Sequence, residues 1–370
     1  MTAIAERLEG KRICIVAGSG GVGKTTASAA LALGLAAAGR RVAVVTIDPA
    51  RRLADALGLE ELGNEPHLVD PAVAATHGIE MHGELWAMML DPKATFDGLI
   101  ARLAPDERTR EDVLSNRIYV HLSAAIAGSH EFSAVAKLYE LDRDGDYDAI
   151  VLDTPPSRNA LDFLDAPDRL TDFFEGRALK LFLVPTGIAA RVMGAGTGVV
   201  FSILKRLTGV DLLADVSVLF RAMGGLIGGF RERAAAVKAL LADPATTFLI
   251  VASPEREPVA EAIFFRRKLR EARMPFGGLI VNRATVLGEE ERSHPAAIRA
   301  GLRDALGDAL AAKVAQSVGD AQLLAARSAE AIERLKAELG DPDPIVVPRL
   351  DGEVQDVNGL LVLYRHLSGA

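Results

Sequence analysis

The sequence predicts an α/β protein whose core is a doubly wound, mainly parallel sheet. Two observations support this fold class. Continuous apolar segments of strand length alternate with longer segments of helical pattern, which is typical of a parallel sheet covered by helices on both faces. In addition, a strand, a glycine-rich loop, a helix and a second strand follow one another within the first 48 residues. This order predicts a right-handed, parallel βαβ unit.

The individual elements follow from the same patterns. The first strand is "KRICIVAG" (11–18), and an alanine-rich helix (25–40) and a second strand (41–48) complete the βαβ unit. Five later apolar segments are expected to be strands: 84–91, 147–156, 246–255, 276–285 and 344–350. Helices are expected at 257–273, 318–339 and 354–367.

Two regions depart from the alternation and predict a helical subdomain beside the sheet. The segments at about 92–145 and 157–242 have mostly helical patterns, and the second is also rich in glycine and poor in charge. We therefore expect residues 1–370 to form a single domain in which these two insertions build the helical subdomain.

Composition narrows the classes of function. The net charge of −8 argues against non-specific binding to nucleic acid or to an anionic membrane surface. The short basic segment "RRKLREAR" (266–273) is expected to be the solvated face of a helix. The apolar stretch at 181–204 is interrupted by Arg191 and diluted by glycine, so we expect no stable membrane insertion. The charged N-terminal segment predicts a cytoplasmic location.

The glycine-rich loop "GSGGVGKTT" (18–26) matches the P-loop pattern and predicts an ATP site. Glycines allow backbone N–H groups to surround phosphate oxygens, and the helix that follows points its positive end at the anion. Lys24 is expected to reach the terminal phosphates, and the Thr25 hydroxyl is expected to bind Mg²⁺. The nucleotide contacts expected in this loop are Gly20, Gly21, Val22, Gly23, Lys24, Thr25 and Thr26.

Two aspartates at predicted strand ends are the candidates for the remaining chemistry. Asp153 closes the strand "IVLD" and is expected to hold Mg²⁺ together with Thr25. Asp48 follows the second strand and could orient the attacking water. Parallel strands bring both carboxylates to the same edge of the sheet. Either aspartate could instead be a turn or cap residue.

Asn282 and Arg283, in "LIVNRAT", are the candidates for contact with the nucleotide base. A side-chain amide both donates and accepts hydrogen bonds, which suits an adenine edge. The alternative is that Asn282 only shapes a turn.

Four segments, in one order, together resemble one family. They are "GGVGKTT" (20–26), "DPARRLADALG" (48–58), "DYDAIVLDTPP" (146–156) and "GGLIVNR" (277–283). Together they are similar to the arsenite-pump and tail-anchored-protein-targeting ATPases, also called anion-transporting or ArsA-type ATPases. The resemblance implies that Asp48 positions the hydrolytic water, that Asp153 senses Mg²⁺ and that Asn282 binds adenine.

The resemblance also implies a nucleotide-gated dimer that presents a hydrophobic surface to a protein client. That surface is expected in the glycine-rich helices at 185–230. The protein is thus expected to bind and hydrolyse ATP and to act as a switch. Two alternatives stay open: an ATPase subunit that energises an efflux pump, and a nucleotide-binding module with little turnover.

Ser19 is the main departure from the family pattern. The family has a lysine here, which reaches across the dimer to the partner's nucleotide. A serine brings no positive charge, so turnover is expected to be weak or to depend on a partner chain, either a second copy or a related ATPase. Arg51 and Arg52 are the candidate substitutes for the missing cation. Because Cys14 is the only cysteine, neither an arsenite site nor a zinc clasp is expected.

Overall fold

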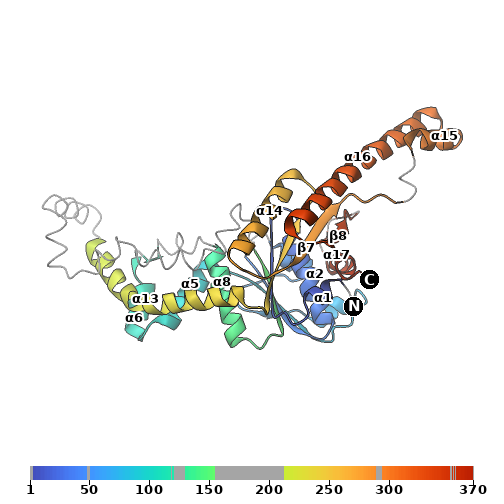
Figure 1. Cartoon of the computed structure of the whole chain (residues 1–370). Helices are drawn as coiled ribbons and strands as arrows, with labels where there is room; N and C mark the ends of the chain where they lie inside the picture. Colours follow the sequence, from blue (N-terminus) through green and yellow to red (C-terminus); the bar gives the residue numbers. More distant parts are fainter. Residues whose placement is uncertain are drawn as a thin grey trace.

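The core of the protein is an eight-stranded sheet (Figure 1). The structure is a computed structural model, and it describes residues 3–47, 51–117, 119–120, 130–154, 212–288, 294–350, 352, 354 and 356–369. In spatial order the strands are β3-β4-β2-β5-β1-β6-β7-β8. Their bounds are β1 (Ile13–Gly18), β2 (Arg41–Thr46), β3 (His67–Leu68), β4 (Glu84–Met89), β5 (Ala149–Asp153), β6 (Thr246–Ala252), β7 (Phe276–Ala284) and β8 (Ile345–Pro348). The seven predicted strands are confirmed, and β3 was not predicted.

All neighbouring strands are parallel except β3, which pairs antiparallel with β4. The strands β1 and β2 are joined through a helix but are not neighbours, because β5 lies between them. This insertion places Asp153, the last residue of β5, opposite Val16 on one side and Thr46 on the other. The carboxyl ends of the first, second and fifth strands therefore meet at one point of the sheet edge.

Helices cover both faces of the sheet, which confirms the doubly wound α/β class. On one face α2 (Lys24–Ala37) packs on β1, β2 and β5 and against α17 (Val357–Ser368), which in turn contacts α1 (Ala3–Arg7). On the other face lie α14 (Arg256–Glu271), α8 (His130–Asp144) and the end of α13 (Leu212–Ala242). All seven residues of β6 are buried as a result, as is typical of a strand covered on both sides.

The described part of the two insertions is helical. In the first, α5 (Pro92–Leu103) and α6 (Glu107–Leu114) precede α8, and α13 runs alongside all three (Figure 1). The ring of Phe96 stacks on Tyr119 and on Phe230, which joins the two insertions. The boundaries of the helical subdomain stay a prediction, and residues 155–211, including the apolar stretch at 181–204, lie outside the described residues. Among the described helices, none combines the length and the apolar character needed to cross a membrane.

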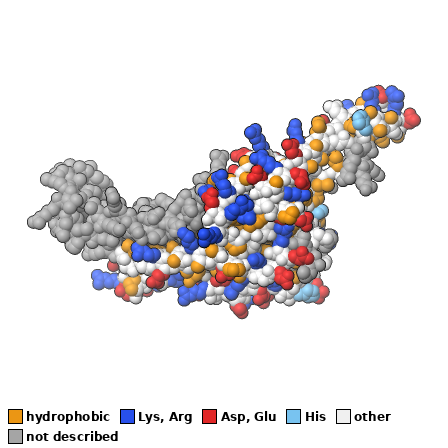
Figure 2. All heavy atoms as spheres, in the orientation of Figure 1, with side chains coloured by type: hydrophobic (Ala, Val, Ile, Leu, Met, Phe, Trp, Pro, Cys, Tyr) orange, Lys and Arg blue, Asp and Glu red, His pale blue; other side chains and the backbone are white. Residues whose placement is uncertain are grey.

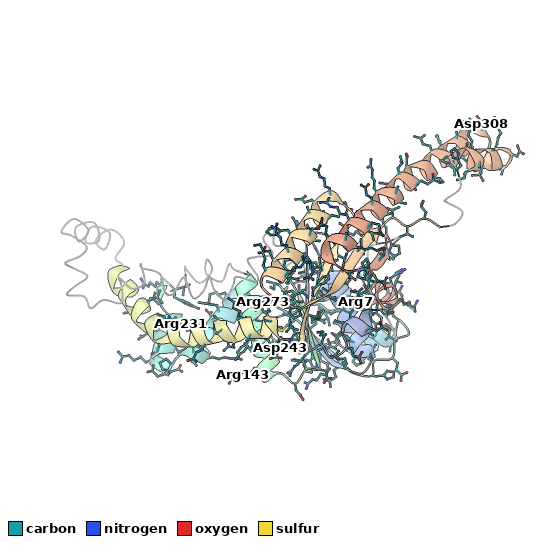
Figure 3. All side chains as sticks on the ribbon, viewed as in Figure 1. Arg7, Arg143, Arg231, Asp243, Arg273 and Asp308 are labelled. Atoms are coloured by element: carbon teal, nitrogen blue, oxygen red, sulfur yellow. The ribbon has the colours of Figure 1, made fainter. Side chains whose placement is uncertain are left out.

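Two helices form an arm that projects from the sheet (Figure 1). They are α15 (Pro295–Leu306) and α16 (Asp308–Leu339), which pack against each other. The helix expected to begin at residue 318 begins at Asp308, directly after Gly307, whose φ of 75° ends α15. Asp308 accepts from Arg299 and Arg303 near the tip of the arm (Figure 3). Exposed leucines lie along this arm: Leu306, Leu310, Leu323 and Leu324.

The far end of α16 is anchored to the N-terminal helix. Arg7, labelled in Figure 3, forms an ion pair of 2.8 Å with Asp341, and that carboxylate also accepts from the backbone N–H of Leu279 in β7. Basic side chains gather over α14 in Figure 2, where Leu269 is buried and Arg267 is exposed. The segment "RRKLREAR" is therefore a solvated helix face, as predicted.

Candidate functional site

The glycine-rich loop connects the end of β1 to the start of α2, and close contacts and backbone angles favour glycine at both of its ends. A Cβ on Gly18 would lie 2.0 Å from the Val251 carbonyl oxygen. A Cβ on Gly23 would lie 2.3 Å from Asn282 Nδ2, and its φ of 95° is in the left-handed region that favours glycine. The loop can therefore approach β6 and β7 closely only with these residues.

Lys24 is the first residue of α2 and lies folded against this loop. Its Nζ donates a 2.8 Å hydrogen bond to the Ser19 carbonyl oxygen, and the residue is only 6% exposed. Gly20 and Gly21 are exposed at the mouth of the loop, whereas Val22 is buried beneath it. The loop thus places a buried cation at a helix N-terminus, where the backbone N–H groups and the helix dipole favour an anion.

Three oxygen-bearing side chains converge behind Lys24. Asp153 is 1% exposed, and its Oδ2 accepts hydrogen bonds from the Thr25 hydroxyl at 2.6 Å and from the Thr46 hydroxyl at 2.9 Å. The sheet order creates this contact, since β5 brings Asp153 between the ends of β1 and β2. The structure therefore brings together the two residues predicted to hold Mg²⁺, and it adds Thr46.

These donors fit a magnesium ion that is held mainly by nucleotide. Hydroxyl and carboxylate oxygens are hard ligands, and Mg²⁺ usually takes only one or two protein ligands and fills its shell with phosphates and water. No group of three or more His, Cys, Asp or Glu residues that could hold an ion by itself occurs in the described part of the chain. Thr25 and Asp153 would be the protein's contribution.

Asn282 lies against the glycine-rich loop. Its Nδ2 donates to the Val22 carbonyl oxygen at 2.9 Å, and its Oδ1 accepts from the backbone N–H of Arg283 at 3.0 Å. Both residues lie in the strand predicted at 276–285, since β7 ends at Ala284, and Arg283 has a φ of 59°. The amide is thus beside the loop, and its contact with adenine stays a prediction.

The structure describes Ser19, which stands where the resembling family has a lysine, and Arg51, which is a candidate substitute for that lysine. Ser19 is 8% exposed, so it is buried within the chain. Arg51 begins α3 (Arg52–Ala56) with a φ of 55° and forms an ion pair of 3.3 Å with Glu61. Asp48 lies outside the described residues, so its predicted role stays a prediction.

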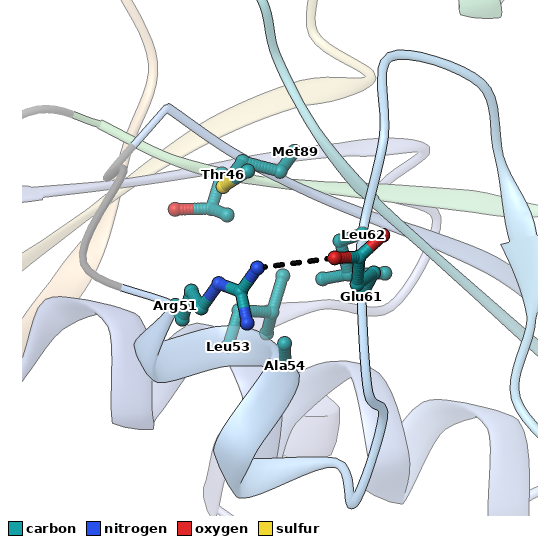
Figure 4. Close-up of a pocket in the computed structure, with 7 residues that line it drawn as sticks. All are labelled: Thr46, Arg51, Leu53, Ala54, Glu61, Leu62 and Met89. Carbon is teal, nitrogen blue, oxygen red and sulfur yellow. Dashed lines mark hydrogen bonds and ion pairs between the residues drawn. The ribbon is translucent and has the colours of Figure 1, made fainter.

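A cavity of about 210 Å³ lies at the carboxyl ends of β2 and β4 (Figure 4). Its lining residues are Thr46, Arg51, Leu53, Ala54, Glu61, Leu62 and Met89. Sequence reasoning missed Thr46 and Glu61. The position of Thr46 at the end of the second strand was a signal for it, whereas nothing near Glu61 marked that residue.

The chain matches one family model and is similar to several known proteins. The family model described as "Anion-transporting ATPase" matches residues 11–305. The chain is also similar to proteins named ATPase get3: 33% identical over 160 residues in Aspergillus terreus, 34% over 160 residues in Aspergillus niger and 33% over 159 residues in Neurospora crassa. These alignments cover 42–43% of this chain and 43–44% of the relatives, so the similarity spans less than half of each relative's length.

Proposed function

The chain belongs to the anion-transporting ATPase family, and we propose that it binds MgATP and hydrolyses it as a nucleotide-gated switch. The observation that carries the proposal is the convergence of Thr25, Thr46 and Asp153 directly beside the Lys24 loop. An isolated glycine-rich loop would account for phosphate binding alone. A buried carboxylate bonded to the loop threonine supplies the second part that a metal-dependent phosphoryl transfer needs.

Each residue of the site has a distinct role in this proposal. Lys24 leaves the Ser19 carbonyl and neutralises the terminal phosphates, while Thr25 and Asp153 position Mg²⁺. The bound ion would supply charge neutralisation at the transferring phosphoryl group. Asp48 orients the attacking water, and Asn282 binds adenine while it retains or exchanges its bond to Val22. The remaining residues of the glycine-rich loop, together with Arg283 in β7, complete the nucleotide contacts.

The switch would arise from the position of Asp153. Its carboxylate links the end of β5 to Thr25 after β1 and to Thr46 at the end of β2. A change in phosphate or metal occupancy at Thr25 therefore reaches β2 through two hydrogen bonds. We propose that this link reorients two subunits, either two copies of this chain or this chain and a related ATPase, in the cytoplasm as the sequence predicts.

We propose that a hydrophobic protein client binds in response to that reorientation. Within the described part of the predicted client region, α13 supports a binding role because Val218 is exposed and no described residue lies within 4 Å of a Cβ added at Gly225 or Gly228. The efflux-pump alternative gains nothing from the structure. Cys14 is buried, and burial raises the pKa of its thiol to about 12, so it offers no thiolate to a metalloid.

A nucleotide-binding module with little turnover is the second candidate. The burial of Ser19 favours it, since this position neither carries charge nor reaches out of the protomer. Both candidates require nucleotide binding, and they differ only in the rate of hydrolysis.

Equilibrium binding of MgATP to the full chain tests the part that both candidates share. Lys24→Ala is expected to weaken binding about 100-fold, because it removes charge-assisted hydrogen bonds to phosphate. Lys313→Ala is the matched control, because Lys313 is an exposed lysine on the projecting arm. Equal affinities for wild type and Lys24→Ala would overturn the proposed function.

A further inference from the structure

Arg51 is placed beside the proposed metal site of its own protomer. It lines the 210 Å³ cavity together with Thr46, and the Thr46 hydroxyl is bonded to the Asp153 carboxylate at 2.9 Å. One side chain therefore separates the cavity from the residue that would hold Mg²⁺. Of the two arginines at positions 51 and 52, only Arg51 lines this cavity.

The ion pair of Arg51 with Glu61 is weak and open to exchange. The atoms lie 3.3 Å apart, and the two side chains are 59% and 81% exposed. Exposed pairs of this kind contribute little, because water screens the charges and both side chains lose freedom. A guanidinium binds phosphate oxygens through paired, charge-assisted hydrogen bonds, so a phosphate group competes well with this carboxylate.

The cavity gives the arginine room to change partners. Figure 4 shows the guanidinium reaching from the start of α3 toward Glu61, with Thr46 and Met89 on another wall. A volume of about 210 Å³ holds several water molecules, so the side chain can turn without repacking the core. Arg51 has a left-handed backbone directly before α3.

We propose that Arg51 exchanges Glu61 for the terminal phosphate of a nucleoside triphosphate bound in the same protomer. Arg51 then supplies, in cis, the positive charge that Ser19 lacks, and Glu61 is a counter-ion that opposes this exchange when the terminal phosphate is absent. The inference rests on the proposed nucleotide site and names its regulation. Its consequence is a preference for the triphosphate over the diphosphate that depends on both residues.

The test measures the affinities of MgADP and of MgATPγS for the full chain by calorimetry and compares their ratio. Arg51→Gln is expected to lower the triphosphate preference about tenfold, because it removes a charge-assisted contact made only with the terminal phosphate. Glu61→Gln is expected to raise that preference about two- to fivefold, the range of a weak exposed ion pair. In the double variant Arg51→Gln/Glu61→Gln, the gain from Glu61→Gln is expected to vanish.

Two other residues provide matched controls. Glu60→Gln removes the same charge one position away from Glu61, and Arg143→Gln removes an exposed arginine that does not line the cavity, so both are expected to leave the ratio unchanged. Arg51→Asn is a second variant whose residue type tolerates the left-handed backbone, so a loss shared with Arg51→Gln is not a folding defect.

The outcomes separate this inference from the proposed function. Nucleotide binding that is lost in Lys24→Ala, with a ratio that neither Arg51→Gln nor Arg51→Asn changes, would overturn the inference alone. A gain from Glu61→Gln that persists in the double variant would also overturn it. Binding that does not depend on Lys24 would overturn the proposed function and the inference together.

Discussion

The Thr25 hydroxyl donates a 2.6 Å hydrogen bond to Asp153 Oδ2, although the two residues are 128 positions apart in the chain. The contact exists because β5 is inserted between β1 and β2. It joins the loop that would bind phosphate to the strand end that would sense the metal.

Asp153→Asn is expected to uncouple nucleotide binding from Mg²⁺. The amide keeps the shape of the carboxylate but loses the negative charge that a divalent cation requires. The affinity for ATP in the presence of Mg²⁺ should fall about tenfold or more, whereas the affinity in excess chelator should stay the same. Asp146→Asn is the control, because that side chain is fully exposed before β5. An unchanged Mg²⁺ dependence in Asp153→Asn would contradict its assigned role.

Gly23→Ala is expected to disrupt the loop through a steric clash. The added Cβ would lie 2.3 Å from Asn282 Nδ2 and would displace the amide from the Val22 carbonyl oxygen. We expect the affinity for MgATP to fall about tenfold. Gly21→Ala separates the clash from backbone strain, because Gly21 also has a positive φ but has open space around it. Equal losses in the two variants would show that the contact with Asn282 is unimportant.

Gly34→Ala is expected to destabilise the packing of α2 on α17. The added Cβ would lie 1.9 Å from the Tyr364 ring, and overpacking of this kind costs about 1–3 kcal/mol, offset in part by better helix propensity. Chemical denaturation measures the loss, and Tyr364→Leu in the same chain should restore part of it. Gly228→Ala is the comparison in an open helical position, where no loss is expected. Similar stabilities for both alanine variants would contradict the close packing.

Cys14 is expected to be unreactive in the folded protein. Burial raises the pKa of its thiol from 9.0 to about 12, against the smaller opposing effect of Arg40. Since the folded state favours the neutral thiol, its contribution to the free energy of unfolding is complete below pH 9 and declines as the pH rises from 9 toward 12. The difference in unfolding free energy between wild type and Cys14→Ala should shrink over that range. Rapid native-state labelling by a thiol reagent at pH 8 would show that the thiol is accessible.

Much of the fold could be predicted because its strands are buried on both faces. The segments that became β1, β5 and β6 are continuous apolar runs, and such runs are readable without knowledge of their neighbours. The strand β3 was not predicted because it has only two residues, both of which are exposed. The start of α16 was not predicted: the helix begins at Asp308, directly after Gly307, whereas the sequence predicted a helix only from residue 318.

The candidate site likewise contains some residues that could be predicted from the sequence and others that could not. Lys24 and Thr25 are specified by a local motif, and Asp153 by the end of an apolar strand. Thr46 and Glu61 depend on which strands are neighbours, and the order of strands in space is not contained in their order along the chain. The bond from Asn282 to Val22 likewise requires β7 to lie near the loop, so the sequence suggested a ligand role but not this contact.

The most direct test of the account is the rate of ATP hydrolysis per subunit over a wide range of protein concentration, with Lys24→Ala as the blank. The expected rate depends on Mg²⁺, rises with concentration as subunits associate, and is absent from the blank. A rate equal to the blank at every concentration would contradict hydrolysis by this chain alone and would leave a nucleotide-binding module that needs a partner.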